Sequence, residues 1–567
     1  MSKNNSLKPE GYYVNIANKY IDDVLSGKVV ACKWIKLACE RQKKDLSRTD
    51  WEYVFNVKKA ERICRFAELI KHVKGKKSKS NLVLEPWQCF IYTTVFGWVN
   101  KFTDYRRYRD VYIEIARKNG KSFLSIPVGL YMLALDGEAG SEVYVAASHR
   151  EQTKHVFDPA ISIVKGDSKL RNGLGLECTK YSIFKGDNFF QRLVRDSGGS
   201  NDGSNPHCAI IDELHAHKTR DTHDSILLGT AARAQPIIWR ITTAGYNRAG
   251  ICYEQNNYVK KILLGHHEDE TYFGAIYTLD DEDDWKDPNV WIKANPNLNV
   301  SFDVSYLQKE CNKSIGSSAS LNAFLTKSLN IWVNAESAWM NMVEWEKCAD
   351  SKLKIEDFKK DPCFVGCDLA SKMDFACVSK VFIRKINGKT HYYAFVDHYL
   401  NENAIEEATN DQIDGWVHDG WVHSTEGMNT DFERIRDDIG EFSKEYNIKA
   451  VAFDPSEAFL LRKELKDMYG IDSDEYNQNT TNMSEPTFEL EAVVKDGRFH
   501  FNGDPVLSWM VSNVVAKINA KDQIHPKRDI NNFNAKIDGA IATIIAIGRY
   551  LRDQPKSKTI NPQMFIF

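Results

Sequence analysis

A short polar turn carries the first set of residues that could do chemistry. It reads Arg-Lys-Asn-Gly-Lys-Ser and lies between an apolar, β-branched run at Val111–Ile115 and an apolar, helix-like run that begins at Phe123. The N–H groups of such a turn and the N-terminus of the next helix bind phosphate oxygens. A lysine adds a point charge, and a serine hydroxyl can ligate Mg²⁺. The sequence therefore predicts a nucleotide-phosphate site at Arg117, Lys118, Asn119, Gly120, Lys121 and Ser122.

Two observations bear on this interpretation. The usual phosphate loop has a glycine five residues before Gly120, and this chain has Ile115 there. Because a bare Gly-Lys-Ser match is also common in solvated loops, other residues must decide. Gln88 lies upstream, just after Pro86, which favours a helix start. Its amide could donate to and accept from the edge of an adenine at once. The alternative is an ordinary residue of the first helical turn.

A pair of acids follows the next informative strand. Cys208–Asp212 is an apolar run that predicts a buried strand, and Glu213 comes directly after it. At the carboxyl edge of a parallel sheet, Asp212 would hold the metal of a nucleotide and Glu213 would act as general base. The alternative is that Asp212 caps the next helix. A phosphate turn and an acid pair about ninety residues apart are much rarer by chance than either alone.

A further apolar run ends in small polar residues. It spans residues 236–241 and leads into Thr242, Thr243, Ala244 and Gly245. Beside the acid-bearing strand, such a strand end could sense the γ-phosphate of a nucleotide, whereas the alternative is a β-turn at Gly245. Residues 111–245 together predict a doubly wound α/β domain that hydrolyses a nucleotide.

Three aspartates lie on separate apolar elements in the second half of the chain. Asp368 is on the first strand of a predicted hairpin, Asp454 ends a strand, and Asp538 is in the first turn of an apolar helix. Each alone could be a turn residue or a helix-terminal charge. Buried carboxylates need a charged partner, so the three together predict two Mg²⁺ or Mn²⁺ ions for phosphodiester cleavage. Asp374 could be a fourth ligand or a polar residue of the hairpin.

Length and composition limit the remaining choices. With 567 residues, two or three domains are expected. The net charge of −3 leaves any nucleic-acid contact to local patches. The twelve cysteines form no CxxC pair, which favours reduced thiols. We find no apolar run long enough to cross a bilayer.

The order of these motifs resembles the large subunit of tailed-phage terminases. The matching segments are the Gln88 segment, ARKNGKS, AIIDELHAH, TTAG, LNIWV near Leu329, GCDLASKMDFA, AFDPS and KIDGAIA. They extend from about Tyr12 to Leu551. The missing glycine is part of the resemblance, since the turns of this family often read Arg-x-x-Gly-Lys-Ser/Thr.

The resemblance implies an α/β protein with two enzymatic domains. An N-terminal P-loop ATPase domain of the ASCE type precedes a C-terminal nuclease domain of the RNase H-like fold. We expect an N-terminal helical region at 1–80, the ATPase domain with its linker subdomain at 81–335, a linker at 336–360, the nuclease domain at 361–555 and a C-terminal tail at 556–567.

The resemblance also implies roles for individual residues. Lys121 and Ser122 resemble the phosphate lysine and the Mg²⁺-binding hydroxyl, and Asp212 and Glu213 resemble the metal-holding acid and the catalytic glutamate. Thr242 to Gly245 resemble the element that couples hydrolysis to movement. Asp368, Asp454 and Asp538 resemble the metal ligands of the nuclease. For an arginine finger that reaches a neighbouring subunit, Arg150 and Arg195 are candidates; an ordinary surface arginine is the favoured alternative for each. We also expect Arg117 near the phosphates.

The implied activity is ATP-driven movement of double-stranded DNA into a procapsid, with endonucleolytic cutting of concatemeric DNA. The implied cofactors are ATP with Mg²⁺ for the ATPase and two Mg²⁺ or Mn²⁺ ions for the nuclease. The implied partners are double-stranded DNA, the portal protein, the small terminase subunit and further copies of the chain in a ring, a pentamer when docked on the procapsid; no membrane is expected. The expected location is the host cytoplasm, transiently on the procapsid and not in the mature virion.

Two other functional classes remain open. The chain could be a helicase-like, DNA-remodelling ATPase whose C-terminal half binds DNA without cutting it. It could also be a capsid-assembly protein without catalysis. Loss of DNA cleavage on mutation of Asp368 would argue against the first alternative. DNA-stimulated ATPase activity that depends on Lys121 would argue against the second.

Overall fold

The computed structural model describes residues 8–73, 75, 78–147, 150–193, 204–217, 219–248, 250–315, 318–333, 339–408, 410, 412–455, 458–518, 523–528 and 535–554. The chain forms two compact units. The first comprises residues 1–315 and 323–333, and the second comprises residues 316–322 and 334–567. Among the described residues, no helix is both long and apolar enough to span a bilayer.

The first unit is an α/β structure. Its elements in chain order are α1 (Tyr12–Leu25), α2 (Lys33–Ser47), β1 (Tyr53–Phe55), α3 (Val57–Ala67), α4 (Pro86–Gly97), β2 (Trp98–Asn100), β3 (Asp110–Glu114), α5 (Lys121–Ala134), β4 (Glu142–Ala146), α6 (Arg150–Gly166), α7 (Ser168–Leu174), β5 (Glu177–Cys178), β6 (Ser182–Lys185), β7 (Asn188–Arg192), β8 (Cys208–Asp212), α8 (Asp221–Gly229), β9 (Ile237–Thr242), α9 (Ile251–Leu263), β10 (Tyr272–Ile276) and α10 (Val304–Ser314). Helix α11 (Ser318–Ser328) begins in residues of the second unit and ends in the first.

The main sheet of this unit has eight strands in the order β10-β3-β9-β8-β4-β7-β6-β5. The six strands from β10 to β7 are parallel, and β6 and β5 continue the sheet antiparallel. Strand β9 therefore lies between β3, which precedes the phosphate turn, and β8, which precedes the acid pair. Because all three are parallel, the turn, the acids and the end of β9 meet at one edge of the sheet.

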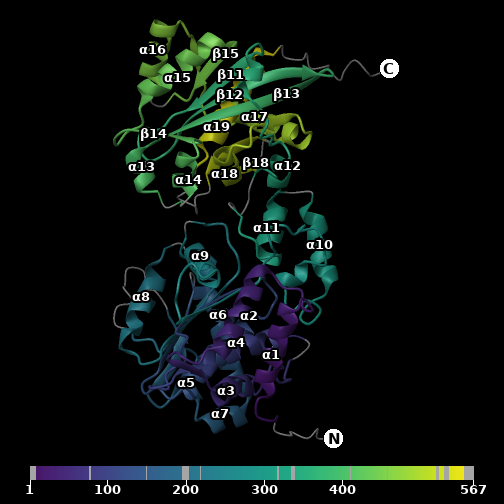
Figure 1. The fold of residues 1–567 in the computed structure, drawn as a ribbon, viewed down its shortest axis with the longest axis vertical. Helices are drawn as coiled ribbons and strands as arrows, with labels where there is room; N and C mark the ends of the chain where they lie inside the picture. Colours follow the sequence, from purple (N-terminus) through teal and green to yellow (C-terminus); the bar gives the residue numbers. More distant parts are fainter. Residues whose placement is uncertain are drawn as a thin grey trace. The chain divides into compact units, whose positions relative to one another are not determined.

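Helices cover both faces of this sheet. On one face, Ser125 of α5 accepts a hydrogen bond from the indole of Trp239 on β9. On the other face, Arg240 of the same strand donates to His223 of α8, and Tyr112 of β3 contacts α9. Helices α1, α3 and α4 pack on one another beside the sheet (Figure 1). The result is the doubly wound arrangement that the sequence predicts.

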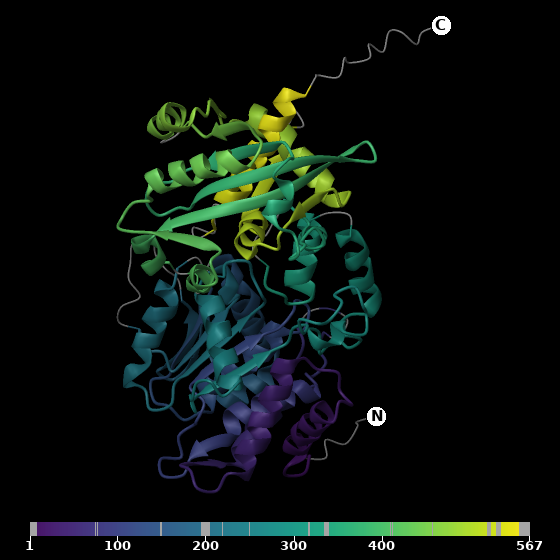
Figure 2. The ribbon, with the colours of Figure 1, turned by 45° about the horizontal axis from the view of Figure 1, so that its top comes forward.

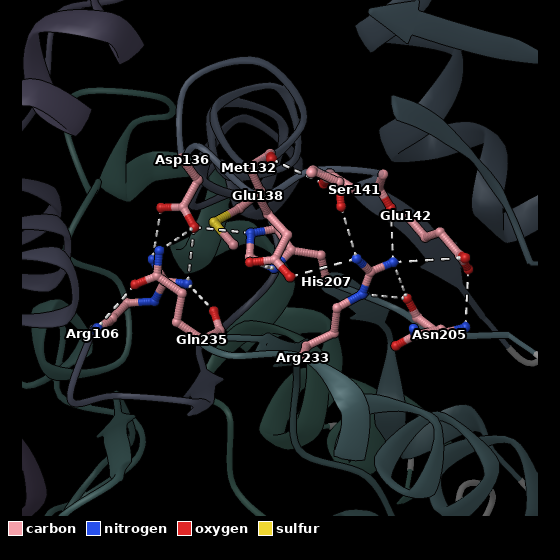
Figure 3. Close-up of polar contacts among 12 residues, drawn as sticks. Arg106, Met132, Asp136, Glu138, Ser141, Glu142, Asn205, His207, Arg233 and Gln235 are labelled. Carbon is pink, nitrogen blue, oxygen red and sulfur yellow. Dashed lines mark hydrogen bonds and ion pairs between the residues drawn. The ribbon is translucent and has the colours of Figure 1, made fainter. Parts of the chain in front are cut away.

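A buried ion-pair network lies at the amino edge of the sheet, opposite the carboxyl edge that carries the phosphate turn and the acid pair (Figure 3). Arg106 donates to both carboxylate oxygens of Asp136, at 2.9 and 3.4 Å. His207, directly before β8, lies 2.9 Å from the same carboxylate, and Gln235, before β9, donates to it at 3.2 Å. Burial alone would raise the pKa of Asp136, but the Arg106 guanidinium and the His207 contact hold that pKa well below its usual range.

Replacement of Asp136 by asparagine should destabilise the first unit by about 3–5 kcal/mol near neutral pH, because Arg106 would keep a buried charge without its partner. A depressed carboxylate pKa stabilises the fold above the unfolded pKa of about 3.9 and loses that contribution as the pH falls. The difference between wild type and Asp136→Asn should therefore shrink below about pH 4. Urea unfolding of the full chain at several pH values measures it.

Asp22 provides the matched control for this experiment. It forms an ion pair with Lys43 in which both side chains are about 60% exposed, so Asp22→Asn should leave the unfolding midpoint close to wild type. A loss for Asp136→Asn that is no larger than for Asp22→Asn would contradict the role of the buried network.

The second unit contains a mixed sheet. Its elements are α12 (Met342–Glu346), β11 (Cys363–Asp368), β12 (Ala376–Ile386), β13 (Lys389–Asn401), α13 (Glu402–Glu406), α14 (Gln412–His418), β14 (Val422–Thr425), α15 (Phe432–Glu445), β15 (Ile448–Phe453), α16 (Phe459–Tyr469), β16 (Ser473–Glu475), α17 (Thr480–Lys495), β17 (Phe499–Phe501), α18 (Pro505–Asn513), β18 (Val514–Ile518), β19 (Ile524–Arg528) and α19 (Asp538–Asp553). The strand order is β14-β13-β12-β11-β15-β16, with β17 paired to β13.

Strands β11 to β13 form an antiparallel meander, and β11 pairs parallel to β15. The predicted hairpin after Cys363 is thus confirmed. Separate hydrophobic cores fill the two faces of the sheet: one is made with α15 and α16, the other with α17, α18 and α19. Figures 1 and 2 show these two groups of helices on opposite sides of the strands.

Sequence and structure differ at two places in the first unit. The helix after the phosphate turn begins at Lys121, not at Phe123, so that the lysine and Ser122 belong to its first turn. Strands β5 and β6 extend the sheet with a short antiparallel edge that the sequence did not indicate, because strands of two and four residues are too short to show an alternating pattern.

Candidate active sites

The phosphate turn joins β3 to α5 in a tight backbone conformation. Lys118 and Gly120 have left-handed φ values of 70° and 82°, and Gly120 is the residue before the helix. Glycine adopts this conformation at no steric cost, whereas Lys118 must be held in it. The turn therefore presents the amino end of α5 toward the carboxyl edge of the sheet, as an anion-binding turn requires.

Asn119 braces this turn from inside. The side chain is buried and donates to Asn295 at 2.8 Å. Its oxygen accepts from the backbone N–H of Asn297 at 3.0 Å, and Asn297 in turn donates to the Asn119 carbonyl and accepts from the indole of Trp87. Asn119 thus positions the turn through contacts in the protein interior.

Lys121 and Glu213 meet across β9. The ammonium group lies 3.9 Å from a Glu213 carboxylate oxygen and donates to the Ile115 carbonyl at 3.3 Å. Burial lowers the pKa of Lys121, and the nearby Glu213 and Asp212 carboxylates offset this only in part. The structure therefore brings together the lysine of the predicted phosphate site and the acid pair of the next predicted motif.

The two acids differ in environment. Burial, and then the charge of Glu213, raise the pKa of Asp212. Burial would also raise the pKa of Glu213, but Lys121 and His215 outweigh it and hold that pKa below its usual range. Glu213 is therefore ionised at neutral pH, as a proton acceptor must be. Its left-handed φ of 51° is a strained conformation for a non-glycine residue and is often found at functional sites.

His215, which sequence reasoning missed, lies beside Glu213. Burial lowers the pKa of His215, so the ring is neutral at physiological pH. Its Nε2 lies 3.3 Å from the Lys327 ammonium, which can only donate, so the proton is on Nδ1. Nδ1 lies 3.1 Å from both Glu213 and the Thr242 hydroxyl. The ELHAH spacing could have indicated such a histidine, but Lys327 is too distant in sequence.

The end of β9 contacts this group directly. Thr242 accepts from the backbone N–H of His215 at 3.1 Å, and the Thr243 hydroxyl lies 3.4 Å from the same ring. The Ala244 N–H donates to Asn330 at 2.6 Å. A Cβ on Gly245 would come within 3.1 Å of His215, so this position is packed closely. The four residues therefore connect the acid pair to the segment after α11.

The other predicted nucleotide contacts are placed as follows. Gln88 is buried and accepts from the Glu85 N–H at 3.0 Å, which makes it part of a helix-capping box. This is the first-turn role that the sequence left open. Arg117 is exposed, and its charge acts on both Lys121 and Glu213. The side chains of Arg150 and Arg195 lie outside the described residues.

The second candidate site gathers the aspartates of the second unit. Asp368 ends β11 and Asp454 follows β15, and these neighbouring parallel strands pair up to Cys367 and Phe453. Asp538 begins α19, which packs on β11. Three segments far apart in the sequence therefore deliver carboxylates to one edge of the sheet.

The electrostatics of this edge fit a divalent cation. Burial and the Asp538 carboxylate raise the pKa of Asp368, with Asp454 and Asp374 adding to the shift, while a 2.8 Å hydrogen bond from Gln478 opposes it. Carboxylates are the ligands that Mg²⁺ and Mn²⁺ prefer, and a cation would offset their repulsion. As the side chains stand, however, no group of three such ligands among the described residues is arranged to hold an ion.

Asp374 has a cationic partner. Its carboxylate forms an ion pair with Lys536, and Arg528 lies 3.8 Å away. The sequence left Asp374 open between metal ligand and hairpin residue, and this ion pair adds a third role, the positioning of Lys536. Gln478 and Lys536 were both missed from the sequence because nothing local marks them.

Gly366 allows α19 to approach β11. A Cβ at this position would lie 2.1 Å from the Ala542 carbonyl and 2.5 Å from the Ala546 nitrogen, both backbone atoms. We expect Gly366→Ala to push α19 away, move Asp538 relative to Asp368, and destabilise the second unit by about 1–3 kcal/mol or more. Thermal unfolding and DNA cleavage of the full chain test this; Gly415→Ala, where a Cβ meets nothing, is the control. Equal behaviour of the two variants would contradict it.

Two family models match successive parts of the chain. A family model described as the terminase large subunit, ATPase domain, matches residues 86–261, and one described as the terminase large subunit, endonuclease domain, matches residues 266–554. The second match begins before β10, although β10 pairs with β3 in the sheet of the first unit. The predicted two-domain α/β fold class is confirmed.

The chain is similar to individual proteins over much of its length. Protein YmfN of Escherichia coli (strain K12) is 38% identical over 63% of this chain and 80% of its own length. The terminase large subunit of Enterobacteria phage HK97 is 24% identical over 77% of this chain and 85% of its own length. The crystal structure of the HK97 large terminase covers 86% of this chain and 99% of that chain at 22% identity, with a TM-score of 0.42. The chain thus belongs to the terminase large subunit family and carries the ATPase and endonuclease domains of that family.

Proposed function

We propose that this protein moves double-stranded DNA into a procapsid by ATP hydrolysis and cuts concatemeric DNA with a metal-dependent nuclease. The observation that carries the proposal is the meeting of Lys121 and Glu213 at the edge of one sheet, combined with a separate carboxylate cluster in the other unit. The first arrangement suits phosphoryl transfer to water and the second suits phosphodiester cleavage.

In the ATPase unit, Lys121 and the N–H groups of the turn bind the phosphates, and Ser122 and Asp212 hold Mg²⁺. Glu213 takes a proton from the attacking water while His215 keeps its carboxylate oriented. On hydrolysis Lys121 exchanges its contact with the γ-phosphate for one with Glu213, and Thr242 to Gly245 carry the change to the segment after α11. The charge of Arg117, which acts on Lys121 and Glu213, supports a role for this residue at the phosphates.

In the nuclease unit, Asp368, Asp454 and Asp538 hold the metal, with Asp374 adjacent. A bound pair of Mg²⁺ or Mn²⁺ ions supplies an activated water and stabilises the leaving oxygen. Gln478 orients Asp368 through its hydrogen bond. Burial and neighbouring carboxylates raise the pKa of Asp368 and of Asp538, so these two groups must be deprotonated to bind a cation.

The partners and boundaries belong to the same proposal. The protein acts as a ring, a pentamer on the procapsid, with the portal protein and the small terminase subunit, in the host cytoplasm and not in the mature virion. The domain limits at 80, 335, 360 and 555 and the trans-acting arginine, Arg150 or Arg195, are also proposed. The family-level part of this proposal is supported by relatives that are named as terminase large subunits of phages.

The test compares wild type, Lys121→Ala and Asp368→Ala on linear and circular DNA, with and without ATP, Mg²⁺ and Mn²⁺. DNA-stimulated ATPase activity should disappear in Lys121→Ala and persist in Asp368→Ala, and metal-dependent cleavage should show the reverse. Cleavage that survives in Asp368→Ala would contradict the assignment of the nuclease to this cluster, and absence of metal-dependent cleavage in wild type would favour the alternative of an ATPase with a non-cleaving module. ATPase activity that survives in Lys121→Ala would contradict the phosphate site.

A further inference from the structure

Glu114 is a buried carboxylate that the proposed chemistry does not use. It is the last residue of β3, six residues before Gly120, and is 0% exposed. No lysine, arginine or histidine lies within ion-pair distance of it in the part of the chain that the structure describes. A buried carboxylate is costly unless hydrogen bonds compensate its charge, so its neighbours must supply donors.

Four side chains supply them. On the strand and helix side, Tyr112 donates at 2.5 Å and Asn256 of α9 at 2.9 Å. From the segment after α11, Asn330 donates at 3.3 Å, and the Trp332 indole lies 3.2 Å from both carboxylate oxygens. Glu114 therefore ties β3 to residues 329–333, a stretch that we call the exit segment because it is the last part of the first unit along the chain.

The same exit segment also holds the end of β9. Asn330 has a left-handed φ of 57°, and its oxygen accepts from the Ala244 N–H at 2.6 Å. The Val333 N–H donates to the Gly245 carbonyl at 3.3 Å. A Cβ on Gly245 would lie 3.1 Å from His215 and 3.2 Å from Trp332. The exit segment thus touches the strand end beside Glu213 as well as the strand that leads into the phosphate turn.

We infer that Glu114 is a positioning residue that fastens the exit segment to both strand ends, so that nucleotide occupancy at the phosphate turn changes the mobility of residues 329–333. The inference deepens the proposed function and rests on its nucleotide site. It assigns Asn330 and Trp332 as the two groups through which Glu114 acts. Because the donors converge on one buried carboxyl group, removal of both should weaken the link more than removal of either.

Two substitutions remove the hydrogen bonds to Glu114 while they preserve the local backbone and packing. Asn330→Gly keeps the left-handed backbone and removes the amide. Trp332→Phe keeps an aromatic ring against Tyr253, whose centroid is 4.9 Å from that of Trp332, and removes the indole N–H. The matched control is Asn299→Gly, which makes the same change at an exposed residue with a φ of 64°. Thermal unfolding checks that each variant is folded.

Hydrogen–deuterium exchange on the full chain, with and without a Mg²⁺-bound non-hydrolysable ATP analogue, measures the link directly. In wild type and Asn299→Gly, the analogue should slow exchange both in the phosphate turn and in the exit segment. In the double variant Asn330→Gly/Trp332→Phe, the phosphate turn should still respond, while the response of the exit segment falls by about fivefold or more. In Glu114→Gln, which keeps one acceptor oxygen, the response of the exit segment should lie between that of wild type and that of the double variant. In Glu114→Ala, the response should match that of the double variant.

The outcomes are distinguishable. An exit segment that responds equally in wild type and in the double variant would overturn the inference. So would a wild-type exit segment that ignores the analogue while the phosphate turn is protected. Absence of protection at the phosphate turn itself in wild type would overturn the nucleotide site, and the inference with it.

Discussion

Replacement of Glu213 by glutamine should reduce ATP turnover by about 10²–10⁴-fold and leave ATP binding nearly unchanged. The substitution keeps the size of the side chain but removes the carboxylate that accepts a proton from water. Lys121, 3.9 Å away, and the N–H groups of the turn remain to bind the phosphates. Loss of the counter-charge also leaves Lys121 free to pair with the γ-phosphate, so binding should not weaken. Steady-state ATPase assays and equilibrium binding of a labelled ATP analogue measure the two effects.

Two further variants serve as controls for Glu213→Gln. Lys121→Ala should lose both binding and turnover, because the charge that contacts the phosphates is gone. Glu254→Gln removes a half-exposed carboxylate of α9 that pairs with Arg220, and it should behave as wild type. If Glu213→Gln lost ATP binding to the same extent as Lys121→Ala, the role of general base would be wrong.

Replacement of Asp368 by alanine should abolish metal-dependent DNA cleavage, by at least about a hundredfold, since even residues behind the metal ligands cost that much. Asp368 is buried, feels the charges of Asp538, Asp454 and Asp374, and accepts a hydrogen bond from Gln478. Without it, Asp454 and Asp538 lack the central acid of the cluster. ATPase activity should persist, because Asp368 belongs to the other compact unit.

The measurement is the cleavage rate of supercoiled DNA across a titration of Mn²⁺ and of Mg²⁺, with a chelator as the blank. Asp472→Ala, which removes an 83% exposed carboxylate paired with Lys466, should cleave as wild type. Gln478→Ala should raise the metal concentration needed for half-maximal cleavage without abolishing it. A metal dependence in Asp368→Ala identical to that of wild type would show that this edge does not hold the metal.

Local pattern was enough to predict much of this fold. A β-branched run, a Gly-Lys-Ser turn and an apolar run predicted β3 and α5, and an apolar run that ends in two acids predicted β8. Neither pattern says which strand lies between them. Only the sheet order shows that β9 lies between β3 and β8. This position of β9 determines which residues can contact both motifs.

Long-range partners could not be predicted for a different reason. Asn119 bonds to Asn297 across 178 positions, and Lys327 reaches His215 across 112. Amides and lysines are common on protein surfaces, so nothing in their immediate sequence distinguishes a buried brace from a solvated side chain. Gln88 shows the converse: its motif was visible, but only the structure reveals the capping box that engages its oxygen.

The close contact between α19 and β11 at Gly366 affects the order in which the protein becomes active during synthesis. Lys121 and Glu213 come from segments fewer than a hundred residues apart, whereas the nuclease edge needs a strand at 363–368 and a helix at 538–553. Domains generally fold from the N-terminus as the chain emerges from the ribosome. The hydrolase site can therefore assemble on a nascent chain that still has no means to cut DNA, and nuclease competence comes last.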